Sequence, residues 1–373
     1  MLGVYIHIPF CEKKCNYCAF SSFARLGEKQ KYISSLVQEI GGYKGENKVD
    51  TIYIGGGTPS LLSNDELGQI LNALKEKFSI EKDSEITIEC NPNSLSEEKL
   101  KFYKENGVNR ISIGVQRLND EKLKILGRLH NYSQALQTID LAKKYFENVS
   151  VDFIIGLQDE WEQYEKEIEK LIEEKVKHIS VYMLQVEEKT PLQKMVLKNP
   201  GLILEDEEYV EIYEKMVKKL KKNGFFQYEV SNFAQKGFES KHNFKYWSGE
   251  NYIGFGLSAH SYIDGVRFAN ASNFDDYYKR KIELKEVLTD KQKVEEHIML
   301  GLRCRNGIDK NFIKSFGYDI EKNKNYNDYL SQNILIESGD KVFLNPDYYS
   351  VNNLVIVNLL EWKDETKFVS FFL

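Results

Sequence analysis

Strand-like and helix-like segments alternate through the first half of the chain, and this alternation restricts the fold more than any other feature of the sequence. Six short runs have the length and composition of strands, and each is followed by a helix-like segment or a loop. Strands joined by helical crossovers pair in parallel. The sequence therefore predicts an α/β fold with a complete or partial (β/α) barrel. The expected strands are Val4–Ile8, Thr51–Ile54, Ile86–Glu89, Arg110–Val115, Val149–Ile155 and His178–Leu184.

Local signals place the helices between these strands. Residues 28–41 have a helical pattern, and Trp161, Tyr164 and Ile168 fall on one helix face. Ser63 with Glu66, and Ser94 with Glu97, have the spacing of capping boxes that open helices.

The pattern changes after residue 205. A long helix is expected to end at Gly224, and Thr289 is expected to open another helix. Between them, Tyr228–Val230, Gly254–Ser261 and Val266–Ala269 are predicted strands, the last two joined by an Asp264-Gly265 turn, and Glu321–Asp328 is a predicted solvated loop. We therefore predict a barrel core over 1–204, an extension over 205–285 and a small C-terminal domain over 286–373.

Composition excludes some classes of function. The chain has 373 residues, a net charge of −6 and no basic stripe, so no nucleic-acid partner is expected. No apolar run reaches the length of a transmembrane helix, and the first residues have the pattern of a strand and not of a signal peptide. A cytoplasmic location is predicted.

Three of the five cysteines are crowded into a Cys-x3-Cys-x2-Cys motif: Cys11, Cys15 and Cys18. In a chain without an export signal, such crowding indicates metal binding and not a disulfide framework. Thiolates bind iron–sulfur clusters, and three of them leave one iron of a [4Fe–4S] cubane free for a small chelating ligand. The alternative is a structural zinc site completed by His7 or Cys90.

A glycine loop follows the second predicted strand. Gly55-Gly56-Gly57-Thr58-Pro59 would let a ligand approach the backbone closely, and it matches neither the dinucleotide nor the P-loop pattern. By itself the loop is equally compatible with a tight turn, and the cysteine motif favours the ligand interpretation. Like the cysteines, Glu89 and Gln116, the loop lies at or after a strand end, where (β/α) barrels place their active sites.

These motifs together resemble those of the radical S-adenosylmethionine (SAM) superfamily, and more narrowly the oxygen-independent coproporphyrinogen III oxidase group. The likeness covers Tyr5–Cys11, the cysteine motif and Gly55–Ser60, and extends over most of the chain. It implies a partial (β/α)6 barrel followed by a small, mostly helical, winged-helix-like domain. It also implies a [4Fe–4S] cluster and S-adenosyl-L-methionine as cofactors.

The resemblance further implies a set of cofactor-binding residues beside the metal ligands Cys11, Cys15 and Cys18. Tyr5 and Tyr17 would lie near the adenosyl ligand, and Gly56, Gly57 and Thr58 would contact its methionyl end. Glu89 would hold the amino group, Gln116 and Arg128 the carboxylate and ribose, and Asp152 the ribose hydroxyls. Without the family, Glu89 or Asp152 could equally form an ion pair inside the barrel, and Arg128 could pair with a neighbouring helix.

The chain departs from the oxidase pattern in two places, and in both it resembles the haem chaperone (HemW-like) branch of the group. Phe20 stands where the oxidase has a fourth cysteine, and only four residues precede Tyr5, where the oxidase has a long N-terminal arm. That branch also carries a His-Asn-x-x-Tyr-Trp motif, present here from His242 to Trp247.

A porphyrin-type ligand suits this motif chemically. Imidazole is a standard axial ligand of haem iron, Tyr246 and Trp247 offer flat apolar faces, and Lys245 could meet a propionate. The alternatives are that His242 is an ordinary hydrogen-bonded histidine, and that His260 is the ligand. The motif adds His242 and haem to the expected binding set.

The sequence thus favours a haem chaperone that hands haem to an acceptor protein, which could be membrane-associated. A homodimer is left open. A radical SAM enzyme that oxidises a porphyrinogen, or one that acts on another substrate, is the alternative, so enzymatic activity is not decided by the sequence.

Overall fold

The computed structural model describes residues 1–360, and its elements separate into two units. The first unit comprises Met1–Tyr246 and Glu250–Val287, and the second comprises Trp247–Gly249 with the described part of Leu288–Leu373. Each unit has its own sheet.

A twelve-stranded sheet organises the described residues of the first unit. Its order is β12-β11-β10-β9-β1-β2-β3-β4-β5-β6-β8-β7. Strands β1 to β6 pair with one another in parallel, and β9 pairs in parallel with β1. The remaining pairs are antiparallel. The strands are β1 (Leu2–Ile8), β2 (Lys48–Gly56), β3 (Ser79–Cys90), β4 (Arg110–Gln116), β5 (Asn148–Ile155), β6 (His178–Met183), β7 (Phe226–Gln227), β8 (Asn232–Ala234), β9 (Tyr252–Phe255), β10 (His260–Ile263), β11 (Val266–Asn270) and β12 (Ile282–Val287).

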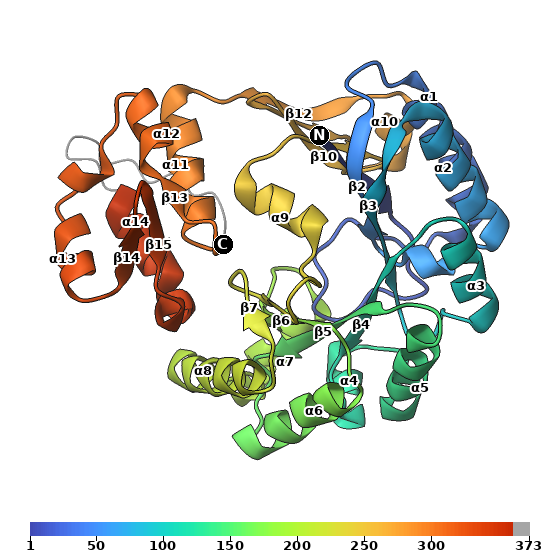
Figure 1. Ribbon diagram of the computed structural model, residues 1–373. Helices are drawn as coiled ribbons and strands as arrows, with labels where there is room; N and C mark the ends of the chain where they lie inside the picture. The colour runs from blue at the N-terminus through green and yellow to red at the C-terminus, as the bar shows by residue number, and fades with distance from the viewer. Residues whose placement is uncertain (361–373) are drawn as a thin grey trace. The chain divides into compact units, whose positions relative to one another are not determined.

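Helices connect the parallel strands, as the alternation in the sequence predicts. Figure 1 shows them along the outer side of the curved sheet, with α9 on its other side. The apolar side chains of these helices and of the outward-facing strand positions form one core, in which Ile6, Ile54 and Ile113 are fully buried. The helices are α1 (Lys29–Gly42), α2 (Asn64–Lys77), α3 (Glu97–Glu105), α4 (Asp120–Leu126), α5 (Tyr132–Lys143), α6 (Trp161–Glu173), α7 (Pro191–Lys198), α8 (Asp206–Lys222), α9 (Lys241–Ser248) and α10 (Phe274–Tyr278), with 3-10 turns η1 (Leu26–Glu28), η2 (Pro59–Leu61) and η3 (Pro200–Leu202).

The expected six-stranded parallel β/α core is therefore confirmed. Several caps are confirmed as well: Ser63 and Glu66 form the capping box of α2, and Thr289 caps the first helix of the second unit. Helix α8 ends before Gly224, whose φ is 82°. The Asp264-Gly265 turn joins β10 to β11, because Ile263 pairs with Val266.

Four local predictions were wrong. The cap of α3 is Ser96, whose side chain accepts from the N–H of Lys99, and not Ser94. Residues 228–231 form the turn between β7 and β8 and not a strand, because the backbone N–H of Tyr228 donates to the carbonyl of Asn232.

The predicted strand over 254–261 is two strands, β9 and β10. Gly256 (φ 105°) and Ser258 (φ 58°) take left-handed conformations that interrupt the extended backbone. Residues 321–328 are not a solvated loop either: Asn323 and Tyr326 are buried, and Tyr326 begins a short helix.

The second unit combines short helices with a three-stranded sheet of order β13-β15-β14 in its described residues. This composition fits the predicted small, mostly helical, winged-helix-like domain. Its elements are α11 (Asp290–Gly301), β13 (Ile308–Asp309), α12 (Lys310–Ser315), η4 (Ile320–Lys322), α13 (Tyr326–Ser331), β14 (Leu335–Ser338), β15 (Lys341–Leu344), η5 (Pro346–Val351) and α14 (Asn352–Leu360).

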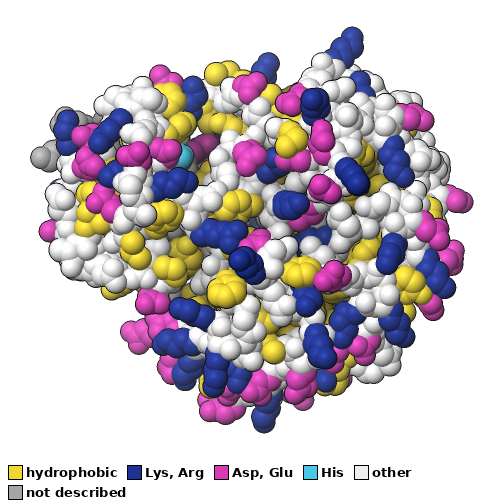
Figure 2. Space-filling model, in the orientation of Figure 1, with side chains coloured by type: hydrophobic (Ala, Val, Ile, Leu, Met, Phe, Trp, Pro, Cys, Tyr) yellow, Lys and Arg dark blue, Asp and Glu magenta, His cyan; other side chains and the backbone are white. Residues whose placement is uncertain are grey.

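The surface over α6 and α8 shows how charge is distributed on the first unit. Basic and acidic side chains are interspersed there (Figure 2), and Lys219 of α8 forms ion pairs with Glu165 and Glu169 of α6. Among the described helices, none is long and apolar enough to cross a membrane.

Candidate functional site

The three motif cysteines line one cavity of about 570 Å³ at the carboxyl ends of the parallel strands. We call this the thiol cavity. Its walls also contain Tyr17, Gly56, Gly57, Thr58, Glu89, Gln116, Arg128 and Asp152. Apart from Tyr5, the cavity therefore collects every residue that the sequence proposed for the cluster and the adenosyl ligand.

The cysteine-bearing loop between β1 and α1 is held by backbone contacts and not by regular structure. The N–H of Cys11 donates to the carbonyl of Phe23. The N–H of Asn16 and its side-chain amide donate to the carbonyls of Leu126 and Ile125 at the end of α4. These contacts turn the cysteines into the thiol cavity, where all three are free thiols of intermediate exposure.

Polar hydrogens approach two of the sulfurs. Arg128 Nη1 lies 3.4 Å from Cys15 Sγ, and Thr58 Oγ1 lies 3.6 Å from Cys11 Sγ. Hydrogen bonds to the sulfurs are one of the ways in which proteins stabilise and tune iron–sulfur clusters.

The glycine loop packs tightly on the cysteine side of the cavity. Gly56 has a φ of 115°, and a Cβ there would lie 2.6 Å from the His7 ring. A Cβ on Gly57 would lie 2.6 Å from the Phe10 carbonyl oxygen. These glycines are therefore required by the fold itself, which agrees with the tight turn that the sequence left open beside the close approach of a ligand.

Glu89 lies at the end of β3, between β2 and the cavity. Tyr53 Oη donates to its Oε1 at 2.7 Å, and the N–H of Gly56 donates to its Oε2 at 3.0 Å. Burial raises the pKa of Glu89 to about 7, and the nearby Asp152 also raises it. A carboxylate held in this way is a strong partner for a cationic amino group.

Asp152 and Gln116 reach the cavity from neighbouring strands. Asp152 lies inside β5, as predicted, and accepts from Ser112 Oγ at 3.3 Å. Burial raises the pKa of Asp152. Gln116 has a φ of 66°, and a register shift between β4 and β5 falls between Gly114 and Gln116. Such an irregularity re-aims a side chain at a strand end.

Arg128 connects the strand ends to the cysteine loop. Its Nη2 donates to Asn91 Oδ1 and to the Gly114 carbonyl, each at 2.6 Å. Its Nε is buried without a hydrogen-bond partner among the described residues. A buried guanidinium nitrogen in this state can serve an anionic ligand.

Sequence reasoning missed Asn91, which touches both Arg128 and Thr58. Asn91 Nδ2 donates to Thr58 Oγ1 at 3.0 Å. Its place directly after β3, at the carboxyl end of a parallel strand, was the signal that could have identified it.

Comparison with known proteins places this geometry in a family. A model of the radical SAM superfamily matches residues 5–174. The protein named heme chaperone HemW from Lactococcus lactis subsp. lactis is 36% identical over 368 residues, which cover 96% of this chain and 97% of that protein. The heme chaperone HemW of Bacillus subtilis is 38% identical over 336 residues, which cover 86% of this chain and 88% of that protein. The chain belongs to the heme chaperone HemW family of radical SAM proteins.

A solved structure confirms the fold of this HemW-family chain. Coproporphyrinogen III oxidase (HemN) from Escherichia coli, a radical SAM enzyme, superposes with a TM-score of 0.84 over 96% of this chain and 90% of its own. Its sequence identity is 18%, so it bears on the fold alone.

The donor set fits a [4Fe–4S] cluster with an adenosyl ligand. The three thiols share one cavity, and Glu89 and Arg128 supply an anion and a cation beside them. Within residues 1–360, no group of three or more His, Cys, Asp or Glu side chains has the arrangement that would hold a single metal ion. His7, a ligand in the zinc alternative, has both ring nitrogens within 2.9 Å of other partners, Tyr5 Oη and the Ser21 carbonyl.

Two predicted residues lie outside the thiol cavity. Tyr5 lies in the middle of β1 and lines a neighbouring cavity. His242 is 0% exposed, with Nδ1 2.9 Å from Thr51 Oγ1 and Nε2 2.8 Å from Tyr246 Oη. Burial lowers the pKa of His242 to about 3, so its imidazole is neutral.

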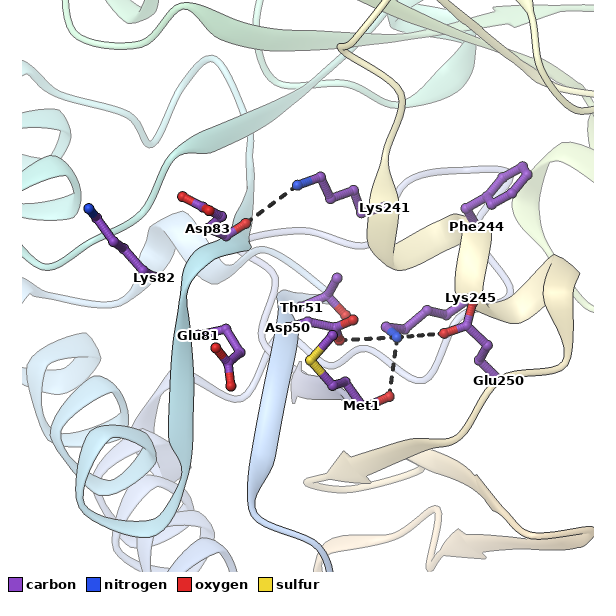
Figure 3. Close-up of a pocket in the computed structure, with 10 residues that line it drawn as sticks. All are labelled: Met1, Asp50, Thr51, Glu81, Lys82, Asp83, Lys241, Phe244, Lys245 and Glu250. Carbon is purple, nitrogen blue, oxygen red and sulfur yellow. Dashed lines mark hydrogen bonds and ion pairs between the residues drawn. The ribbon is translucent and has the colours of Figure 1, made fainter.

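Lys245 is also engaged, contrary to the idea that it could meet a propionate. Its ammonium group lies 3.0 Å from Asp50 Oδ1 and 2.8 Å from Glu250 Oε2, and donates to the Met1 carbonyl (Figure 3). The helix that carries both residues is fixed at its start, where the N–H groups of Lys241 and His242 donate to the Glu85 carboxylate.

Proposed function

We propose that this protein is a haem chaperone, which binds haem and passes it to an acceptor protein. We further propose that it carries a [4Fe–4S] cluster on Cys11, Cys15 and Cys18, and S-adenosyl-L-methionine beside the cluster. Relatives named heme chaperone HemW, aligned over nearly the whole chain, support the haem role.

The position and exposure of Phe20 favour the chaperone function over the enzyme alternative. This residue stands where the oxidase pattern has a fourth cysteine, and its side chain is 71% exposed at the rim of the thiol cavity. An exposed aromatic ring beside a cavity is an apolar surface that a flat ligand can cover.

The residues of the thiol cavity have separate roles in this proposal. Glu89 would hold the amino group of the adenosyl ligand, and Arg128 with Gln116 its carboxylate and ribose. Gly56, Gly57 and Thr58 would contact its methionyl end, Asp152 its ribose hydroxyls, and Tyr17 its adenosyl part. The cluster supplies one-electron chemistry when it is bound.

We also assign a role to each of the three regions of the chain. Residues 1–204 would carry the cluster and the adenosyl ligand, 205–285 would add the haem-binding extension, and 286–373 would form the C-terminal domain.

A transfer experiment tests the function. Haem-loaded, anaerobically reconstituted protein is mixed with a haem-free acceptor such as apomyoglobin, and the absorption spectrum is followed. We expect the spectrum of the haem-bound acceptor to grow as that of the donor declines. In parallel, the protein is incubated with coproporphyrinogen III, S-adenosylmethionine and a reductant. Rapid formation of protoporphyrinogen IX without haem transfer would establish the enzyme alternative.

A further inference from the structure

A second cavity, of about 610 Å³, opens next to the thiol cavity in the first unit. Its lining includes Tyr5, Phe20, Tyr246, Tyr252, His260 and Leu284, and we call it the tyrosine cavity. Ala19 and Phe20 line both cavities. The volume lies within the usual range for small-molecule sites, and the aromatic lining suits a flat ligand.

His260 presents an exposed imidazole to this cavity. It is the first residue of β10 and pairs with Ala269 of β11, which in turn pairs with Leu284 of β12. Ala269, which has a small side chain, lines the cavity beside His260. Leu284, the next residue across the three paired strands, is 38% exposed. Partial burial and Arg267 lower the pKa of His260, while Glu283 raises it. A lowered pKa favours the neutral imidazole, which is the form that coordinates metals.

The other two histidines of this region are engaged elsewhere. His7 also lines the tyrosine cavity, but its two nitrogens contact Tyr5 and the Ser21 carbonyl. His242 is buried behind Tyr246, with Thr51 on its other nitrogen. His260 therefore has the most accessible imidazole for an iron atom in this cavity.

The motif that contains His242 shapes the wall of the cavity. His242 Nε2 bonds to Tyr246 Oη, and the Tyr246 ring meets the Tyr252 ring edge-on, with centroids 4.6 Å apart. Tyr53 stacks on the His242 ring from β2 and fixes it further. The histidine thus sets the orientation of a ring that lines the cavity.

We propose that the tyrosine cavity binds haem, with His260 as an iron ligand and His242 as a positioning residue that acts through Tyr246. This inference rests on the proposed function. The lining, all of it in the described part of the chain, includes Glu283 and no Lys or Arg. The haem propionates would therefore extend into water, away from that carboxylate.

Haem titrations of the cluster-loaded, full-length protein test the assignment. His260→Ala should lose the spectrum of a histidine-ligated haem and bind haem at least about tenfold more weakly, and added imidazole should restore the spectrum. His260→Met should bind haem with a shifted spectrum, because a thioether replaces the imidazole. His297→Ala, which removes a histidine from the second unit, is the matched control and should leave both properties unchanged.

The positioning role of His242 has a different signature. His242→Ala and Tyr246→Phe should weaken haem binding severalfold but keep the ligand spectrum of the wild-type complex. If His260→Ala matches the wild type while His242→Ala loses the ligand spectrum, the inference is wrong and the chaperone function stands. If the wild-type protein binds no haem, the proposed function itself fails.

Discussion

Glu89→Gln is the sharpest test of the thiol cavity, because the structure gives that carboxyl group a measurable electrostatic state. The pKa of Glu89 rises from 4.5 to about 7, chiefly through burial. This shift corresponds to about 3 kcal/mol of differential stabilisation of the neutral form. A raised pKa contributes stability that is full below the unfolded pKa and is lost as the pH rises through the folded pKa.

The window between about pH 5.5 and about pH 7.5 covers most of this loss. Across it, Glu89 should remove about 2 kcal/mol from the free energy of unfolding of the cluster-free chain. Glutamine cannot ionise. In urea unfolding, the free energy of unfolding of Glu89→Gln should therefore fall by about 2 kcal/mol less than that of the wild type across this pH window. Glu76→Gln, an exposed position on α2, should keep the wild-type slope.

Binding of S-adenosylmethionine should depend on pH in the opposite direction. Its ammonium group favours the ionised Glu89, so its affinity for cluster-loaded protein should rise at least about tenfold across the same window. Glu89→Gln should bind weakly and without this dependence, as calorimetry would measure.

Glu229→Gln is the matched control. The pKa of Glu229 is also raised to about 7 by burial, but Glu229 is not part of the thiol cavity. This variant should change the pH slope of stability and leave the affinity for S-adenosylmethionine unchanged. A wild-type affinity that is flat with pH, or wild-type binding by Glu89→Gln, would refute the assignment of the amino group to Glu89.

Three further predictions concern the cluster and the fold. Cys18→Ala should lower the iron content from about four atoms per chain to nearly none, while Cys304→Ala, a buried thiol in the second unit, should retain the iron. Gly56→Val should lower the free energy of unfolding by about 2 kcal/mol or more, because its φ of 115° suits only glycine; an unchanged urea midpoint would contradict this. Arg117→Met should cost about 3 kcal/mol by leaving Glu167 buried without its partner. The double variant Arg117→Met with Glu167→Leu should recover much of that loss in the same unfolding assay.

The sequence by itself determined the parallel core and many of the residues that line the thiol cavity. Six runs rich in β-branched residues, separated by helical segments, predict a parallel sheet. Parallel strands bring their carboxyl ends to one edge of that sheet. Residues at those ends, such as Glu89 and Gln116, therefore meet the cysteine loop whatever the details of packing. The roles within that cavity stay predictions.

Only the tertiary structure decided the environment of the His242 motif. The motif shows which residues are neighbours along a helix, but not which strand the helix packs against. Packing of α9 on β2 buries His242 against Thr51 and Tyr53, and Lys245 meets Asp50 of the same strand. The accessible imidazole is His260 instead, because two left-handed residues after β9 start a new strand at that point and expose its side chain. Such side-chain exposure depends on contacts between residues far apart in the sequence, which no local pattern encodes.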